Sequence, residues 1–265
     1  MAIPLQKPLK VLIIGDSCVD KYFYGVCERL SPEAPVPILK HIKTDIKNGM
    51  ALNVLENFNS FDVQAEIITN EQTITKERFI DIKSKSHLLR FDHGENKRLQ
   101  QISIDKIKRA GIEDFNAVVL VDYDKGTLEK ENICYISTQC KNGKIPLFVD
   151  SKKEDLSWYE NSIIKINNIE EKRVKKYPLE HELIVTYGKS GARYIDTLYK
   201  TTPVEVHDVC GAGDTFFASL IFKYLLTNNL SKSIKFANEC ARITVTKSGV
   251  YAPTKEDLNN ENICF

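Results

Sequence analysis

The sequence has no long hydrophobic run and no excess of charge of either sign. No apolar segment approaches the length of a membrane-spanning helix. The first one, residues 11–14, is too short for the core of a signal peptide and ends at Gly15-Asp16. The 37 basic and 36 acidic side chains leave a net charge of +1, so no overall field favours nucleic acid or an acidic membrane. We therefore expect a cytoplasmic protein without nucleic-acid or membrane partners.

The cysteines form no metal or disulfide pattern. There are seven, an odd number, with no Cys-x-x-Cys spacing, and no histidine pair has the spacing of a zinc site. Free thiols in a reducing compartment are the simplest interpretation. The residues concerned are Cys18, Cys27, Cys134, Cys140, Cys210, Cys240 and Cys264.

Two common nucleotide-binding motifs are missing. Gly188-Lys189-Ser190 looks like the end of a Walker A loop, but the position of the first glycine holds Leu183. No Gly-x-Gly-x-x-Gly follows the first apolar run, which disfavours a dinucleotide-binding domain.

Short apolar runs alternate with longer amphipathic segments along the chain. The runs are nearly continuous, as strands covered on both faces require. This alternation predicts an α/β fold, a doubly wound and mainly parallel sheet flanked by helices, in one domain of residues 1–265. We expect strands at 11–14, 117–121, 145–149, 163–166 and 183–186, and helices at 49–59, 103–110, 128–138, 168–175, 213–227 and 231–247.

Two regions interrupt the alternation. Residues 22–24 and 36–42 look like strands on either side of a proline-rich turn, and residues 73–82 and 86–91 look like a strand pair. Together they predict a small β lid beside the main sheet, formed by segments of about 20–42 and 73–92.

The segment 206–216 carries the strongest chemical signal. Gly211, Ala212 and Gly213 precede Asp214 where a long apolar helix is expected to begin. Small residues let a ligand approach the backbone, and the free amides of a helix start form an anion site. Asp214 can then take a proton from a hydroxyl that attacks a phosphoryl group. The alternative is a glycine-rich turn with an aspartate favoured by the helix dipole.

A second polar pair and one further aspartate lie beside expected strands. Asn167 and Glu170 follow residues 163–166 at Asn-x-x-Glu spacing, which is also the spacing of a capping box in weaker form. Asp20 lies just past the first strand, at the edge where doubly wound sheets bind ligands.

These segments resemble the ribokinase/PfkB family of sugar kinases. That family's Asp-x-x-Gly-Ala-Gly-Asp-x-Phe pattern is matched from Asp208 to Phe216, and its Asn-x-x-Glu motif is matched at Asn167. The resemblance implies ATP-dependent phosphoryl transfer with Mg²⁺, and leaves room for a monovalent cation. It implies that Asp214 is the base, that Gly211 to Gly213 form the anion hole, and that Glu170 organises Mg²⁺ through water.

The N-terminal half resembles the heptose 7-phosphate kinases of that family. A proline-stiffened loop can exist without a ligand, but it does not explain matches in order over nearly the whole chain. The resemblance implies heptose 7-phosphate as the acceptor, heptose 1,7-bisphosphate as the product, and a homodimer through an apolar lid face that includes Tyr22-Phe23-Tyr24, Val36 and Ile38. The matching runs are Gly15-Asp16-Ser17-Cys18-Val19-Asp20, Ser31-Pro32-Glu33-Ala34-Pro35-Val36-Pro37, Thr75-Lys76-x-Arg78, Leu89-Arg90-Phe91-Asp92, Asp122-Tyr123-Asp124-Lys125-Gly126 and Asp150-Ser151-Lys152.

The resemblance also assigns residues to two ligands. For the cations among them, a solvated side chain without a ligand is the ordinary alternative. The sugar-binding positions are Asp20, Gly49 and Asn53, and the cations for a phosphate already on the sugar are Arg78, Arg90 and Lys125. The ATP-binding positions are Lys152, Asn167, Thr186, Gly188, Gly191 and Asn238.

The chain departs from that family in several places. The second glycine of its Gly-Gly sugar segment is Met50, whose side chain can crowd the sugar or change which sugar fits. Residues 63–75 lack a helix and a strand, and residues 171–183 are short, which can leave part of the sheet for a partner subunit to cover. No His-x-Gly-His motif of a nucleotidyltransferase is present. A kinase for an unphosphorylated sugar and a non-catalytic sugar or nucleotide binder therefore stay open as alternatives.

Overall fold

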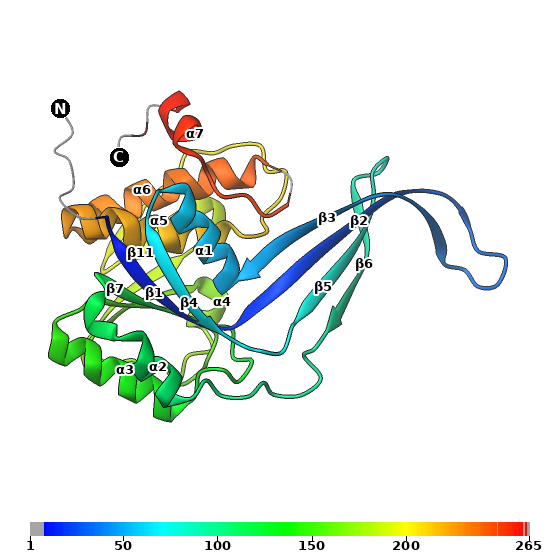
Figure 1. Ribbon diagram of the computed structural model, residues 1–265. Helices are drawn as coiled ribbons and strands as arrows, with labels where there is room; N and C mark the ends of the chain where they lie inside the picture. The colour runs from blue at the N-terminus through cyan, green and yellow to red at the C-terminus, as the bar shows by residue number, and fades with distance from the viewer. Residues whose placement is uncertain (1–7, 248, 262, 264–265) are drawn as a thin grey trace.

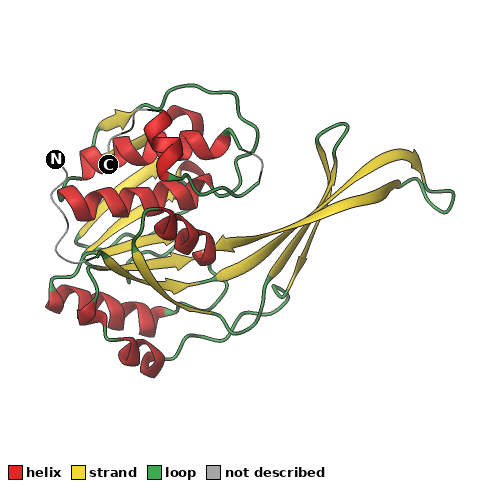
Figure 2. Ribbon diagram, turned by 45° about the horizontal axis from the view of Figure 1, so that its top comes forward, coloured by secondary structure: helices red, strands yellow, loops and turns green. Residues whose placement is uncertain are grey.

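The computed structural model describes residues 8–247, 249–261 and 263, which form two sheets of unequal size (Figures 1 and 2). The central sheet has eight strands in the order β12-β11-β10-β9-β8-β7-β1-β4. The parallel strands are β10, β9, β8, β7, β1 and β4. Strands β11 and β12 extend the sheet in antiparallel orientation. The strands are β1 (Lys10–Gly15), β4 (Gln64–Thr69), β7 (Ala117–Asp122), β8 (Leu147–Ser151), β9 (Ser162–Asn167), β10 (His181–Thr186), β11 (Ala192–Tyr194) and β12 (Thr197–Tyr199).

Helices cover both faces of the central sheet (Figure 1). Along β1, Val11 and Ile13 pack into one core with α1, α5 and α6, whereas Leu12 and Ile14 pack into another with α2 and α3. This two-sided burial is the reason for the nearly continuous apolar strands, and it confirms the expected doubly wound α/β fold. The helices are α1 (Ala51–Ser60), α2 (Ile104–Ala110), η1 (Ile112–Asp114), α3 (Lys130–Gly143), α4 (Asn168–Glu171), η2 (Gly188–Ser190), α5 (Ala212–Thr227), α6 (Leu230–Val245) and α7 (Lys255–Asn260).

Four further strands form a second sheet, which we call the lid sheet, and it projects away from the central sheet (Figure 2). Its order is β3-β2-β5-β6, with β5 parallel to β2 and the other pairs antiparallel. The strands are β2 (Ser17–Leu30), β3 (Pro37–Met50), β5 (Thr75–Asp81) and β6 (Ser86–His93).

The two faces of the lid sheet differ in chemistry. Residues paired across strands share a face, and neighbours along a strand alternate. Tyr22 pairs with Arg78 on what we call the inner face, and Phe23 pairs with Phe79 on the outer face. The expectation that Tyr22-Phe23-Tyr24 forms one apolar face is therefore wrong, because only Phe23 lies on the outer face.

Most expected elements are present with shifted ends. The strand expected at 145–149 is β8, two residues later, and α3 continues to Gly143. The lid hairpin is much longer than the segment 20–42, and β3 ends at Met50, so α1 begins at Ala51 rather than at residue 49. Strands β11 and β12 and helix α7 were not expected at all.

The helix expected at 168–175 is wrong beyond Glu171. After this residue the chain pairs with a neighbouring loop: the amide of Lys175 donates to the Glu154 carbonyl at 2.7 Å, and the amide of Leu156 donates to the Lys176 carbonyl at 2.9 Å. This tertiary pairing overrides the local helical pattern.

The structure bears on two expectations from the composition, free cysteines and the absence of a membrane-spanning helix. The six described cysteines are free, and Cys264 lies outside the described residues. Among the helices described, none combines the length and the apolar character that crossing a bilayer requires.

Candidate active site

The C-terminal ends of the parallel strands meet at one edge of the central sheet, where such folds bind ligands. Helix α5 begins at this edge. A Cβ atom placed on Gly213 would lie 3.3 Å from the Nζ atom of Lys165 on β9, so the first turn of α5 closely approaches the strand ends.

Asp214 lies in this first turn, and its side chain is held from two distant elements. The Asn53 amide donates to its Oδ2 atom at 2.8 Å, and the Tyr123 hydroxyl donates to its Oδ1 atom at 3.0 Å. Only 6% of Asp214 is exposed. Burial raises its pKa to about 6, with the Asn53 hydrogen bond opposing this effect and the charge of Asp150 adding to it. The carboxylate is thus mostly ionised at neutral pH and is a stronger base than an ordinary aspartate.

The start of α5 also presents main-chain donors. Gly211 has a φ of 79°, and a Cβ atom there would lie 2.8 Å from the Asn53 Nδ2 atom, so both conformation and space require glycine. The Ala212 amide is engaged with a carbonyl at 3.3 Å. In the part of the chain that the structure describes, the amides of Gly213 and Asp214 have no acceptor. Such free amides at a helix start favour an anion.

A buried ion pair lies beside this turn. The Lys165 Nζ atom is 2.7 Å from the Asp150 Oδ2 atom, and the two side chains are 6% and 7% exposed. Burial lowers the pKa of Lys165, but the charge and hydrogen bond of Asp150, together with the charges of Glu170 and Asp214, raise it by more, so the net shift is upward. Lys165 therefore supplies a fixed positive charge between strands and helix.

Asn167 and Glu170 form a capping box at α4. The Asn167 side chain accepts from the Glu170 amide at 2.9 Å, and the Glu170 carboxylate accepts from the Asn167 amide at 2.8 Å. The capping interpretation is confirmed. The second carboxylate oxygen of Glu170 lies 4.0 Å from the Lys152 Nζ atom, which also sits 4.1 Å from the centre of the Tyr123 ring. Burial raises the pKa of Glu170.

The inner face of the lid sheet borders the same space. Asp20 and Arg78 form an ion pair, and both are at least nine-tenths buried. A Cβ atom on Gly49 would lie 2.4 Å from the Asp20 Oδ2 atom, so a larger residue would push into this pair. Burial, together with the charges of Asp20 and Asp214, raises the pKa of the Cys18 thiol to about 12. One thiol therefore lies within electrostatic reach of both the lid pair and Asp214.

The other two cations expected to bind phosphate are also paired with carboxylates. Lys125 forms an ion pair with Glu95, and Glu95 also lies 3.3 Å from the Nζ atom of Lys76. Arg90 donates to both oxygens of Asp92 at 2.9 and 2.8 Å, and its side chain is 55% exposed.

The expected nucleotide loop follows β10. Thr186 ends this strand, and Gly188 has a φ of 56° with no atom within 4 Å of a Cβ position, so the space beside it is open. Asn238 on α6 is buried, and its amide donates to the carbonyl of Tyr199 at 2.7 Å. A Cβ atom on Gly191 would lie 2.0 Å from the same carbonyl oxygen, so Gly191 and Asn238 meet there.

The chain matches a known family of enzymes. The model for pfkB family carbohydrate kinases matches residues 51–257, which is more than half of the chain. The chain belongs to this family. It is a sugar kinase, and the resemblance predicted from the sequence is confirmed.

Individual relatives agree with the family match. The bifunctional protein HldE of Campylobacter jejuni subsp. jejuni serotype O:6 is 32% identical over an alignment of 301 positions, gaps included, which covers 97% of this chain and 65% of that protein. The chain therefore spans less than two thirds of this relative. Ribokinase from Arabidopsis thaliana, in complex with ribose and ATP, has a TM-score of 0.70 at 12% identity, covering 96% of this chain and 98% of its own. Phosphofructokinase-2 from Escherichia coli, in complex with potassium, has a TM-score of 0.69 at 14% identity, covering 96% and 97%. These structures show the ribokinase fold.

The kinase family implies ATP and a divalent metal ion. The residues at the carboxyl edge fit a polyphosphate, because the cations Lys152 and Lys165, the free Gly213 amide and the open space at Gly188 lie there. Within the described ranges, no group of three or more histidine, cysteine or acidic side chains is arranged to hold a metal by itself.

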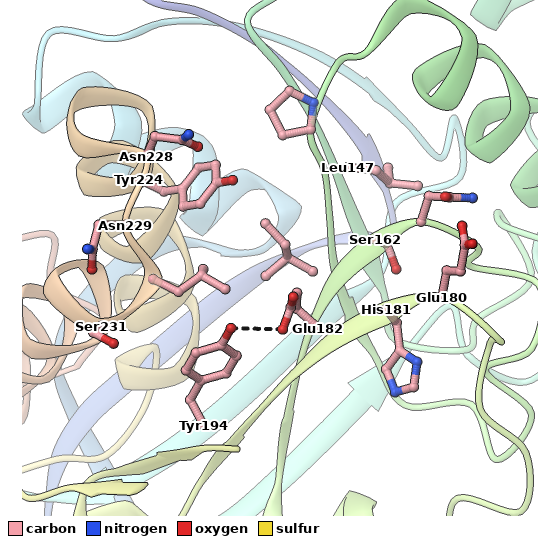
Figure 3. A pocket seen from close by; sticks show the side chains of 14 residues that line it. Leu147, Ser162, Glu180, His181, Glu182, Tyr194, Tyr224, Asn228, Asn229 and Ser231 are labelled. Atoms are coloured by element: carbon pink, nitrogen blue, oxygen red, sulfur yellow. Dashed lines mark hydrogen bonds between the residues drawn. The ribbon is translucent and has the colours of Figure 1, made fainter. Parts of the chain in front are cut away.

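A cavity of about 590 Å³ lies at the opposite edge of the kinase's central sheet (Figure 3). The first residues of β8, β9 and β10 line it, together with Tyr224 of α5 and the hydrogen-bonded pair Tyr194 and Glu182. It contains none of the residues predicted to bind ligands. It does border residues 180–182, near the end of the short segment 171–183.

Three residues of the kinase site were missed from the sequence. Lys165 had a usable signal, because it is a charged residue inside an otherwise apolar strand. Asp150 directly follows the strand expected at 145–149 and lies in the matching run Asp150-Ser151-Lys152, but it was given no role. Tyr123 had no usable signal, because its role depends on a partner 91 positions away.

Met50 occupies a position where the sequence predicted an effect on the sugar. Its side chain is 3% exposed and packs in a small core with Cys18, Ile74 and Leu99. Its φ is 54°, a conformation that favours glycine, so this junction between β3 and α1 is strained.

Proposed function

We propose that this kinase transfers the γ-phosphoryl group of ATP to a heptose 7-phosphate, giving heptose 1,7-bisphosphate and ADP. The observation that carries phosphoryl transfer is the buried Asp214 carboxylate beside unpaired amides at the start of α5. The choice of sugar is supported by the relatives named HldE and by the matches in order along the N-terminal half.

In the proposed reaction, Asp214 accepts the proton of the sugar hydroxyl. The hydroxyl oxygen forms a bond to the γ-phosphorus as the bond between this phosphorus and the bridging oxygen of ADP breaks. The main chain from Gly211 to Gly213, with the free Gly213 amide as the donor, stabilises charge on the transferring group. A Mg²⁺ ion, held near Glu170 through water, neutralises phosphate charge when bound.

In the proposal, the other residues predicted from the sequence bind either the sugar phosphate or the nucleotide. The sugar phosphate is bound by Asp20, Gly49, Asn53, Arg78, Arg90 and Lys125. The nucleotide is bound by Lys152, Asn167, Thr186, Gly188, Gly191 and Asn238. A monovalent cation is a further part of the proposal, supported by the potassium complex of the E. coli phosphofructokinase-2.

ADP release tests the proposal across heptose 7-phosphate, unphosphorylated heptose, fructose 6-phosphate and ribose, with Mg²⁺ and with or without K⁺. We expect the highest kcat/KM for heptose 7-phosphate. Asp214→Asn should lower kcat by about 10²- to 10⁴-fold, because the base is lost. Asp105→Asn, which changes an aspartate in the first turn of α2, is the matched control.

Three outcomes contradict this proposal or part of it. An Asp214→Asn variant as active as the parent removes the base assignment. Preference for ribose or free heptose selects a kinase for an unphosphorylated sugar. Binding by calorimetry without turnover of any sugar selects a non-catalytic binder.

We also propose that the kinase forms a homodimer through the outer face of the lid sheet. Phe23 and Phe79 stack there with ring centres 5.0 Å apart, while Ile46 and Phe91 are 63% and 52% exposed. Exposed apolar surface of this kind favours a protein partner. Light scattering at micromolar concentration should give a dimer for the parent and for Leu179→Lys, and a monomer for Ile46→Lys. A monomeric parent contradicts this arrangement.

We place the reaction in the cytoplasm. Cytoplasmic ATP and the free state of the six described cysteines support this location. Fractionation of the producing cell, with the protein found outside the cytoplasm, would contradict it.

A further inference from the structure

We propose that Lys76 and Lys125 bind the phosphate that the sugar already carries, and that Glu95 occupies this phosphate site until the sugar arrives. This inference rests on the proposed function, because it explains how the kinase selects a phosphorylated acceptor. Neither Lys76 nor Glu95 was assigned a role from the sequence.

The geometry of Glu95 resembles that of a bound anion. One carboxylate oxygen lies 3.3 Å from the Lys76 Nζ atom, and the other contacts the Lys125 Nζ atom. Two oxygens on one central atom, each facing a different ammonium group, are what a phosphate monoester would present to the same pair. The three side chains are only 14%, 26% and 19% exposed, so the cluster is a partly buried site rather than a solvated surface pair.

The three residues come from three different parts of the fold. Lys76 lies on β5, at the inner face of the lid sheet. Lys125 lies in the turn after β7, and its amide donates to Asp16 at 3.2 Å. Glu95 lies in the irregular segment between β6 and α2, directly after Gly94. Lys76 is thus held in a strand and Lys125 in a turn that its amide hydrogen bond to Asp16 fixes, while Glu95 lies on a segment without helix or strand.

The cluster lies on the same side as the catalytic carboxylate. Lys76 is paired in register with Asp20, and its charge acts on the Cys18 thiol together with that of Asp214. Tyr123, two residues before Lys125, donates to Asp214. We therefore place the phosphate end of a sugar whose hydroxyl reaches Asp214 at the two lysines.

The charges favour exchange of the carboxylate for a phosphate. Burial raises the pKa of Glu95, but the hydrogen bond from Lys125 and the charges of both lysines lower it by more, so Glu95 is ionised at neutral pH. Two lysines and one carboxylate leave a net charge of +1. A phosphate monoester carries about −1.5 to −2 at neutral pH, so it balances the lysines better than Glu95 does.

The other cations of this region are less suited to the task. Arg78 is already paired with Asp20, and Arg90 makes two hydrogen bonds with Asp92. Each of these pairs is neutral, so a phosphate gains less from them than from the lysine cluster.

The test compares heptose 7-phosphate with unphosphorylated heptose in the ADP-release assay. We expect Lys76→Met and Lys125→Met each to lower the preference for the phosphorylated sugar by about 10- to 100-fold, mainly through KM. Glu95→Gln removes the competing charge and should leave the KM for heptose 7-phosphate unchanged or lower it. Lys21→Met is the matched control, because Lys21 lies on the outer face and pairs with Glu77 at 3.5 Å.

Two results overturn the inference. One is an unchanged preference in both lysine variants. The other is a Glu95→Gln variant whose KM rises as much as those of the lysine variants, because Glu95 would then be a permanent bridge.

Calorimetry with heptose 7-phosphate or fructose 6-phosphate, without ATP, separates this inference from the proposed reaction. Weaker binding to Lys76→Met than to the parent supports the phosphate site even if no sugar is turned over. Equal binding to both proteins, or no binding to the parent, overturns it.

Discussion

Removing the Tyr123 hydroxyl should shift the pH dependence of the reaction. This hydroxyl donates to Asp214 at 3.0 Å and lowers the pKa of a carboxylate that burial has raised to about 6. A hydrogen bond to a charged group contributes about 1.5–3 kcal/mol, and one pKa unit corresponds to about 1.4 kcal/mol. Because Asn53 still donates to the other oxygen, we take the lower figure. The pKa of Asp214 in Tyr123→Phe should then rise by about one unit.

The sign of the effect follows from the role of a base. A higher pKa leaves more of Asp214 protonated at a given pH, and a protonated carboxyl cannot accept the sugar proton. At sugar concentrations far below KM, where the rate reports the free enzyme, kcat/KM of the variant should be about fivefold below the parent at pH 6 and within about twofold at pH 8.

The control for this measurement is a variant that loses a tyrosine hydroxyl far from Asp214. Tyr194→Phe removes a hydroxyl that donates to Glu182 at 2.8 Å in the distant cavity, and its pH profile should match the parent. A Tyr123→Phe variant with the parent's profile, or with equal loss at every pH, would show that this hydrogen bond does not tune the base.

Two further predictions concern stability, measured by urea denaturation. Lys165→Met should lower the free energy of unfolding by about 3–5 kcal/mol, because Asp150 stays buried without its partner, and the double variant with Asp150→Leu should regain most of the loss; equal stability of the single variant and the parent would contradict this. Gly191→Ala should cost at least about 1 kcal/mol more than Gly188→Ala. Both glycines have positive φ, but a Cβ atom on Gly191 would meet a carbonyl oxygen at 2.0 Å, whereas Gly188 faces open space. Equal losses would show that the space around Gly191 adjusts freely.

The sequence predicted those parts of the fold that depend on local pattern. The parallel strands were found because they are buried on both faces and therefore apolar throughout, as in β7, where all six residues are buried. The lid strands were predicted far too short. Most of β3 is exposed on both faces, so its side chains carry no alternation, and its pairing with β2 defines the strand.

In the site, too, residues in local motifs were predicted, whereas residues that act through distant partners were not. Asp214, Gly211 and Asn167 lie in short motifs whose residue types reveal the chemistry directly. Tyr123 and Glu95 act through partners that only the folded chain brings near. Tyr123, in the turn after β7, contacts Asp214 of α5, and Glu95 contacts Lys76 of the lid sheet and Lys125 of the turn after β7. No local pattern predicts such contacts.

The junction between β3 and α1 has a mechanical consequence. β3 ends at Met50 and α1 begins at the next residue, so no linker separates the hairpin from the helix. Asn53, in the first turn of that helix, holds Asp214, and the Ala51 amide is fixed to the Asp16 carbonyl at 3.0 Å. The lid hairpin is therefore connected directly, through the first turn of α1, to the hydrogen bond that holds Asp214. Any movement of the hairpin over a bound sugar would therefore be transmitted through α1 to the hydrogen bond between Asn53 and Asp214.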